Sequence, residues 1–162
     1  MHQSVMSWVQ QQVAERDLAN VPTLEVGSFN VNGSVRPFFK GSYVGIDMRP
    51  GPGVDQVLNA HDLGMVSNRF LCIVCCEMLE HDTEPWTSIC EMAKVAGDGC
   101  ILLVTCRGFD HRGSFPLHDF PDDVWRFTAI GLRSLLEHGG WEVISVEPDP
   151  TDPGVFAVGC IR

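Results

Sequence analysis

Short apolar runs alternate with amphipathic stretches along the whole chain. Several of the runs are apolar on both faces, which is typical of strands that are covered by helices on two sides. Seven have strand character: residues 23–26, 43–47, 55–58, 70–76, 100–105, 141–147 and 155–161. Because strands and helices alternate, the pattern predicts a single α/β domain over residues 1–162. We expect a Rossmann-like, three-layer arrangement, with a mostly parallel seven-stranded sheet between helices.

The first helix is expected in the amino-terminal segment, residues 1–20. Residues 4–18 carry apolar side chains at the spacing of one helical face, and these are Val5, Trp8, Val9 and Val13. The spacing predicts an amphipathic helix that lies on the body of the domain.

Three further helices have ends that can be predicted from capping residues. Ser34 is expected to cap a short helix, and Thr128 is expected to cap the last helix of the chain. Thr83 is expected to cap a longer helix between them, with Pro85 in its first turn. That helix should stop at Gly97, where glycine can adopt the left-handed conformation.

Composition narrows the choice of partners. The chain has 162 residues, of which 44% are hydrophobic and 20% charged, as in ordinary globular domains. Its formal net charge of −10 should repel nucleic acid and anionic membranes, so we expect neither as a partner. No apolar run approaches the roughly 20 residues that span a bilayer, and the first residues do not resemble an export signal. These features predict a cytoplasmic protein.

The seven cysteines lie mostly inside apolar runs, which is typical of reduced, buried thiols. The spacing of Cys72 and Cys75 is also found in metal and redox sites. A strand, however, directs residues three apart to opposite faces. We therefore expect no metal site.

A tight polar turn, "LEVGSFNVNGS" at residues 24–34, follows the first predicted strand. In parallel sheets ligands bind at this edge, and Gly27 would let the backbone approach one. Asp47 ends the second predicted strand, where a carboxylate can accept hydrogen bonds from ribose hydroxyls. Asp62 follows the third and could receive the amino group of an adenine, with Leu63 covering the ring. A structural turn and a solvated acid are the alternative that Gly27 and Asp47 leave open.

Two further motifs, "CCEMLEHD" after the fourth strand and "WRFT" before the last helix, complete a recognisable order. From about Leu24 to Glu147 the chain resembles class I S-adenosylmethionine-dependent methyltransferases, in particular a small group with "LEH" and "WRFT" segments. The resemblance implies that S-adenosylmethionine is the cofactor. It assigns Glu25 to ordering the first turn, and the following residues to the cofactor: Gly27, Ser28, Asp47, Met48, Asp62, Leu63, Cys76 and Glu77. The family usually has glycines where this chain has Phe29 and Val31.

Two other functions stay open. A dinucleotide-dependent oxidoreductase would use the same edge of the sheet, but its G-x-G-x-x-G fingerprint needs a glycine where Phe29 stands. S-adenosylmethionine has no phosphate and tolerates a bulkier loop. A catalytically weak cofactor-binding or scaffold subunit that needs a partner is the second alternative.

Methyl transfer requires an acceptor held in line with the methyl group, and a base when the acceptor is a hydroxyl or amine. His118 and His81 are the candidate catalytic residues, with His118 preferred because Asp119 follows it; His81 could instead have a structural role.

Residues 106–128 lack helical or strand periodicity and are expected to form a substrate lid. Its candidate substrate contacts are His111, Asp119, Trp125 and Arg126. For Trp125 the alternative is packing of the lid, and for Arg126 it is an internal ion pair. The short chain favours a small-molecule or sugar-type acceptor, and a second subunit could contribute to recognition.

Overall fold

The computed structural model describes residues 1–67, 69–109 and 123–162. The predicted site residues His111, His118 and Asp119 lie outside these ranges. The helices are α1 (Gln3–Glu15), η1 (Arg36–Phe38), η2 (Ala60–Met65), α2 (Pro85–Val95) and α3 (Ala129–His138), of which η1 and η2 are 3₁₀ helices. The strands are β1 (Thr23–Val26), β2 (Tyr43–Asp47), β3 (Gln56–Val57), β4 (Phe70–Cys76), β5 (Ala96–Arg107), β6 (Glu142–Pro148) and β7 (Gly154–Cys160).

The seven strands form one sheet in the order β3-β2-β1-β4-β5-β7-β6. Strands β1 to β5 pair in parallel, and β7 is antiparallel to both of its neighbours. The predicted fold class, a mostly parallel seven-stranded α/β sheet, is confirmed. The first, second and fourth strands occupy the predicted residues, whereas β5 is longer at both ends and takes residues 106–107 from the predicted lid.

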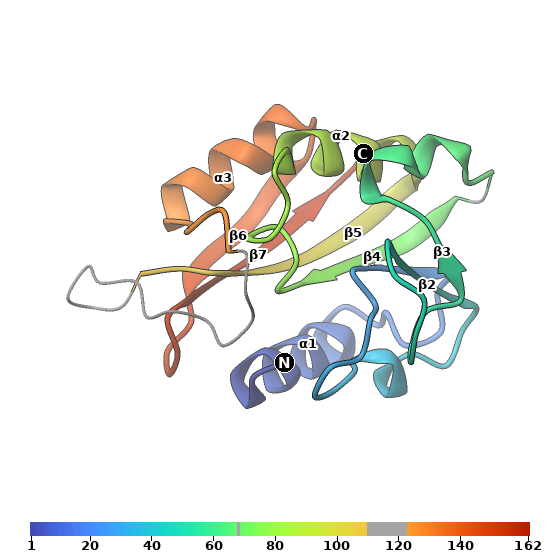
Figure 1. Cartoon of the computed structure of the whole chain (residues 1–162), viewed down its shortest axis with the longest axis horizontal. Helices are drawn as coiled ribbons and strands as arrows, with labels where there is room; N and C mark the ends of the chain where they lie inside the picture. The colour runs from blue at the N-terminus through green and yellow to red at the C-terminus, as the bar shows by residue number, and fades with distance from the viewer. Residues whose placement is uncertain (68, 110–122) are drawn as a thin grey trace.

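Helices cover both faces of the sheet, so the domain has three layers. Figure 1 shows α2 and α3 on one face and α1 on the other. Trp8 of α1 packs on Phe156 of β7, with ring centroids 5.0 Å apart. Cys72 lies in the core beneath α1, while Cys75 lies in the core beneath α2 and α3. The two thiols therefore point to opposite faces, as the strand geometry predicts.

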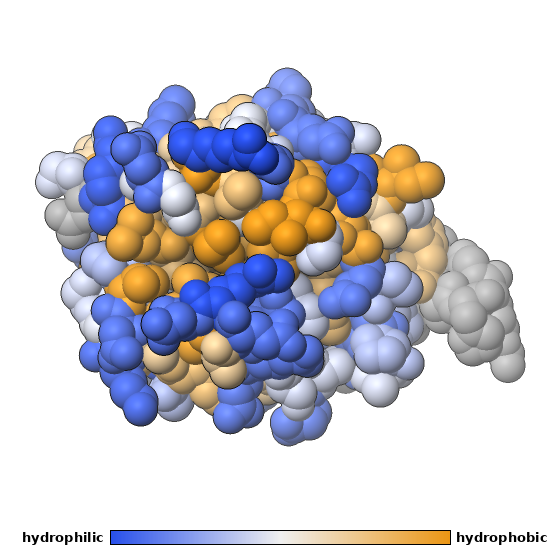
Figure 2. Space-filling model, turned by 180° about the vertical axis from the view of Figure 1, so that it is seen from behind, coloured by the Kyte–Doolittle hydropathy of each residue, from blue (hydrophilic) through white to orange (hydrophobic). Residues whose placement is uncertain are grey.

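Apolar side chains also reach the surface between the layers. Figure 2 shows a band of hydrophobic residues at the height of the sheet, with hydrophilic residues above and below it. The described helices are too short or too polar to cross a bilayer.

One predicted helix cap is confirmed, and one is wrong. Thr128 caps α3, where its hydroxyl accepts a hydrogen bond from the Gly131 N–H at 3.0 Å. Thr83 does not cap α2, because Glu84 occupies the N-cap position, and its side chain makes no capping hydrogen bond. The Asp82 carboxylate instead accepts hydrogen bonds from the Glu84 N–H at 2.9 Å and from the Ser88 hydroxyl.

Two other helix ends also differ from the prediction. The short helix after Ser34 is only a 3₁₀ turn, in which the Ser34 hydroxyl accepts from the Arg36 N–H at 3.2 Å. Gly97 does not end α2 in a left-handed cap, because Ala96 is already extended and pairs with Phe70 as the first residue of β5. The α2 helix therefore runs directly into the strand.

The carboxyl ends of the parallel strands meet at one edge of the sheet. Val26 of β1 pairs with Ile46 of β2, and Cys76 of β4 pairs with Thr105 of β5. The turns that follow these strands therefore lie side by side, which is where parallel sheets bind ligands.

Candidate functional site

The turn after β1 depends on a glycine. Gly27 has a φ of +81°, and a Cβ at this position would lie 2.7 Å from Cγ of Met78. The Gly27 and Ser28 N–H groups both donate to the Ile46 carbonyl, at 3.0 and 2.9 Å. The turn is thus held against the end of β2 on one side and the turn after β4 on the other.

Glu25 supports this turn from inside the sheet. Its carboxyl is buried and accepts a hydrogen bond from the Tyr43 hydroxyl at 2.7 Å. Burial raises the pKa of Glu25 to about 7, against the opposing effect of the Tyr43 hydrogen bond. The side chain therefore joins β1 to β2.

Asp47 lies at the end of β2, where the sequence predicts a ribose contact. One carboxylate oxygen accepts from the Phe29 N–H at 3.3 Å and the other from the Arg49 N–H at 3.0 Å. A carboxylate oxygen can accept more than one hydrogen bond, so both retain capacity for ribose hydroxyls. The adjacent Met48 is 69% exposed and available to a ligand.

Phe29 stands where the methyltransferases that the sequence resembles usually have glycine, and the loop after β2 accommodates it. A Cβ on Gly51 would lie 2.2 Å from the Phe29 ring, so the ring packs directly on that glycine. The Arg49 guanidinium lies 5.3 Å from the ring centroid. The Asn30 N–H donates to the Pro52 carbonyl at 2.8 Å. Phe29 therefore contacts the β2–β3 loop.

The two predicted adenine contacts in η2 have different environments. Asp62 is exposed and can meet a ligand. Leu63 is fully buried in the core beneath α2, because η2 packs against that helix. In this structure Leu63 has no surface on which an adenine could lie, which disagrees with its predicted role.

Glu77 follows β4 in a strained conformation. Its φ is +54°, which is uncommon for a residue with a side chain. The Thr105 hydroxyl donates to Oε1 of Glu77 at 3.0 Å, and Nη1 of Arg107 lies 3.9 Å from Oε2. Nη1 of Arg107 also lies 3.1 Å from Nε2 of His2. Burial raises the pKa of Glu77 against the effect of Arg107.

Cys76, the residue before Glu77, has a buried thiol whose pKa is raised well above its usual range, mainly by burial. The thiol is therefore uncharged at neutral pH. Both residues lie at the end of β4, where the resemblance assigns them to the cofactor.

Glu80 is a functional candidate that the sequence analysis missed. Its side chain is fully buried, and within the described chain neither carboxyl oxygen has a hydrogen-bond partner. Burial, reinforced by Glu77 and Asp123, raises its pKa well above the usual range. The "LEH" motif contains Glu80, but nothing local in the sequence indicates its burial.

His81 is held by the segment that leads into α3. Its Nδ1 lies 3.0 Å from Oδ1 of Asp123. The same carboxylate pairs with Arg126 at 2.5 Å, and Arg126 also donates to the Trp125 carbonyl at 3.0 Å. Arg126 thus forms the internal ion pair that was the alternative to substrate binding.

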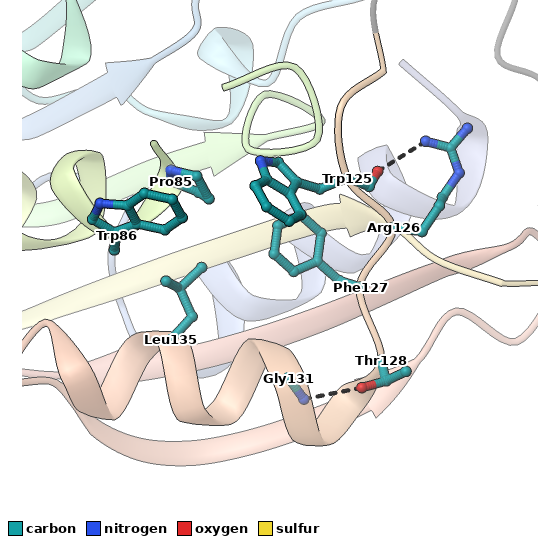
Figure 3. Close-up of a pocket in the computed structure, with 8 residues that line it drawn as sticks. All are labelled: Pro85, Trp86, Trp125, Arg126, Phe127, Thr128, Gly131 and Leu135. Carbon is teal, nitrogen blue, oxygen red and sulfur yellow. Dashed lines mark hydrogen bonds between the residues drawn. The ribbon is translucent and has the colours of Figure 1, made fainter. Parts of the chain in front are cut away.

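An open cavity of about 280 Å³ lies between the start of α2, residues 125–128 and α3. Figure 3 shows Trp86 and Leu135 on one side and Trp125 and Phe127 on the other. Trp86 and Trp125 stand edge to face, with centroids 6.1 Å apart. Trp125 thus lines an open cavity. Trp86 is a lining residue that the sequence analysis did not single out, because its spacing with Ile89 and Ala93 is typical of an apolar helix face.

Within residues 1–67, 69–109 and 123–162, no three His, Cys, Asp or Glu side chains are grouped so that they could hold a metal ion.

Several solved structures share this fold. An S-adenosylmethionine-dependent methyltransferase from Clostridium acetobutylicum ATCC 824 has a TM-score of 0.73 and 10% identity, over 99% of this chain and 92% of that chain. Magnesium protoporphyrin IX methyltransferase from Synechocystis PCC 6803, solved with bound SAH, has a TM-score of 0.71 and 17% identity, over 99% and 82%. The cyclase SpnF has a TM-score of 0.75 and 16% identity, over 96% and 80%.

No protein-family profile matches the chain, and no curated protein matches it. At identities this low, the structural likeness establishes the fold and leaves the activity to be argued from the site. The fold is the Rossmann-like fold of S-adenosylmethionine-dependent methyltransferases.

Proposed function

We propose that this chain binds S-adenosylmethionine at the carboxyl edge of the sheet and transfers its methyl group to a small-molecule acceptor. The observation that carries the proposal is a group of buried polar atoms without hydrogen-bond partners in the described chain: Ser28 Oγ, both Glu80 carboxyl oxygens and Arg107 Nε. They lie at the ends of β1, β4 and β5. Buried polar atoms are rarely left unpaired, so a bound ligand or ordered water is expected nearby.

The residues at this edge fit the cofactor in chemical type. Asp47 would accept hydrogen bonds from the ribose hydroxyls, and the exposed Met48 would lie beside the adenine. Gly27 and Ser28 would face the methionine end, with Cys76 and Glu77 near the sulfonium. When bound, the cofactor supplies a methyl group that is already activated by its positive charge, so this chain mainly has to bind, orient and exclude water.

A base is needed only if the acceptor loses a proton. His118, in the predicted lid, is the preferred base, with Asp119 to orient it and His111 as a substrate contact. His81 is the second candidate, because the Asp123 carboxylate, with Oδ1 3.0 Å from Nδ1 of His81, would orient its ring.

Calorimetry tests the cofactor site. S-adenosylmethionine and S-adenosylhomocysteine are both expected to bind the wild-type chain, and Asp47→Ala should weaken binding by about 1.5 to 3 kcal/mol because charged hydrogen bonds are lost. Asp98→Ala is the matched control, since Asp98 is an exposed acid near the amino end of β5. Binding of NAD without any binding of S-adenosylmethionine would overturn the assignment in favour of a dinucleotide enzyme.

Turnover tests the base. With labelled cofactor and pools of phenols, sugars and amines, His118→Ala should lower turnover roughly 10²- to 10⁴-fold and leave cofactor affinity unchanged. The exposed His138 of α3 provides the control substitution. Loss of turnover in His81→Ala but not in His118→Ala would transfer the role to His81.

A binding subunit that needs a partner is the second candidate function. The cyclase SpnF shares the fold, so the fold alone does not require methyl transfer. Methylation of any acceptor by the isolated chain would exclude this alternative.

A further inference from the structure

We propose that the cavity between Trp86 and Trp125 binds a planar, uncharged aromatic ring. We further infer that this ring is part of the methyl acceptor, and this second step rests on the proposed function. The ring site itself is independent of the proposed function, because it is argued from the walls of the cavity alone.

The two tryptophans that line the cavity are the exposed ones. Trp86 is 43% exposed and Trp125 is 39% exposed, whereas Trp8 and Trp141 are buried in the core. Their edge-to-face arrangement leaves indole surface open to the cavity (Figure 3). An aromatic ring can pair with such a surface in offset or edge-to-face geometry, which stabilises it beyond the burial of its area.

The walls are held in place before any ligand arrives. The Trp125 indole N–H donates to the Asp82 carbonyl at 2.8 Å, and the Trp125 backbone N–H donates to the Glu80 carbonyl at 3.0 Å. The Phe127 N–H donates to the Arg107 carbonyl at 3.0 Å. Little freedom of the Trp125 wall therefore remains to be lost on binding, which favours a small ligand.

The polar groups around the cavity are already engaged. The Arg126 guanidinium pairs with Asp123 and the Trp125 carbonyl, and Figure 3 shows it pointing away from the rings. The Thr128 hydroxyl accepts the capping hydrogen bond from Gly131. A sugar would have to bury hydroxyls here against apolar side chains, and unpaired buried hydroxyls are costly. The lining therefore favours an uncharged aromatic ring over a sugar or an anion.

The size and place of the cavity fit one end of an acceptor. A volume of about 280 Å³ accommodates a single substituted ring. Its Trp125 wall is bonded to Glu80 and Asp82, which belong to the turn that also carries His81. A ring held here would extend toward the end of β4, where the proposed cofactor site lies.

The experiment follows the indole N–H signals by NMR, without cofactor. The chain has four tryptophans, so a ¹⁵N-labelled sample gives four indole signals. Titration with p-cresol, a neutral phenol, should shift the Trp86 and Trp125 signals together and leave those of Trp8 and Trp141 in place. For so small a ligand we expect a dissociation constant on the order of 1 mM.

Trp86→Ala should weaken p-cresol binding by about tenfold, as expected for the loss of one aromatic wall. Unchanged Trp8 and Trp141 signals would show that this variant is folded. Ile130→Ala is the matched control, because Ile130 is 79% exposed on α3 and does not line the cavity. It should bind p-cresol like the wild type.

Methyl glucoside is the competing probe. If methyl glucoside shifts the Trp86 and Trp125 signals and p-cresol does not, the cavity binds a sugar and the proposal of an aromatic ligand is wrong. If p-cresol shifts all four signals equally or none, there is no ring site. Calorimetry with S-adenosylmethionine separates the two proposals. Cofactor binding without a p-cresol response refutes only the ring site. A p-cresol response without cofactor binding refutes the proposed function, and with it the acceptor step, and leaves the ring site standing.

Discussion

Replacing Gly27 by alanine should destabilise the whole domain, and the structure allows the cost to be divided into two parts. The first is backbone strain, because Gly27 has a φ of +81°. An alanine in this left-handed region costs roughly 1 to 2 kcal/mol. The second is a clash, because the new methyl group would lie 2.7 Å from Cγ and 2.8 Å from Cβ of Met78.

The clash cannot be relieved by rotating a flexible end. Cβ of Met78 is attached to the backbone of the turn after β4, so relief requires that turn to move. Overpacking of this kind costs about 1 to 3 kcal/mol. The two parts together predict that Gly27→Ala lowers the free energy of unfolding by about 2 to 5 kcal/mol.

Urea unfolding measures the parts separately when four variants are compared: Gly140→Ala, Gly27→Ala, Met78→Ala and the double variant of Gly27 and Met78. Gly140→Ala measures the cost of backbone strain without a clash, because Gly140 has a φ of +85° and an added Cβ would have no atom within 4 Å. Gly27→Ala should cost about 1 to 3 kcal/mol more than Gly140→Ala. Adding Met78→Ala should recover part of this difference through a coupling between the two positions. Equal costs for Gly27→Ala and Gly140→Ala would refute the reasoning.

Two other substitutions probe stability. The pKa of Glu25, about 7 in the folded chain, lies above its unfolded value of 4.5, so folding retains a proton that unfolding releases. The free energy of unfolding should therefore fall as pH rises from about 4.5 to about 7, and Glu25→Gln should remove about 3 kcal/mol of that fall. Urea titrations at several pH values compare the two chains, and identical pH profiles would contradict the assignment. Thr128→Ala should cost about 1 kcal/mol by removing the α3 cap, and thermal unfolding with no change in midpoint would disprove that role.

The strands were predictable where burial on both faces leaves an uninterrupted apolar run. The run "FLCIVCC" coincides with β4 because both of its faces are covered, and β1 and β2 coincide with their runs as well. The amino end of β5 was not predictable. Ala96 and Gly97 read as the end of a helix, and their extended conformation comes from pairing with β4, which is a tertiary contact.

The candidate site shows the same division between local and tertiary causes. Gly27 and Asp47 have local signatures, and the structure places both at the carboxyl edge. Glu80 has none, because its burial depends on residues that other segments bring over it. Leu63 was predicted to face the adenine from its place after a strand, but the packing of η2 on α2 turns it into the core.

The buried cysteines make unfolding measurable by the reactivity of their thiols. Cys72, Cys75, Cys76, Cys100 and Cys106 are buried, and burial raises the pKa of each thiol. Thiolates react with alkylating reagents and thiols scarcely do, so these five are protected twice in the folded chain, by access and by protonation. Opening the sheet removes both protections at once. The mass gained during brief alkylation, beyond that of the partly exposed Cys90 and Cys160, therefore reports the fraction of molecules whose sheet has opened, and no engineered probe is needed.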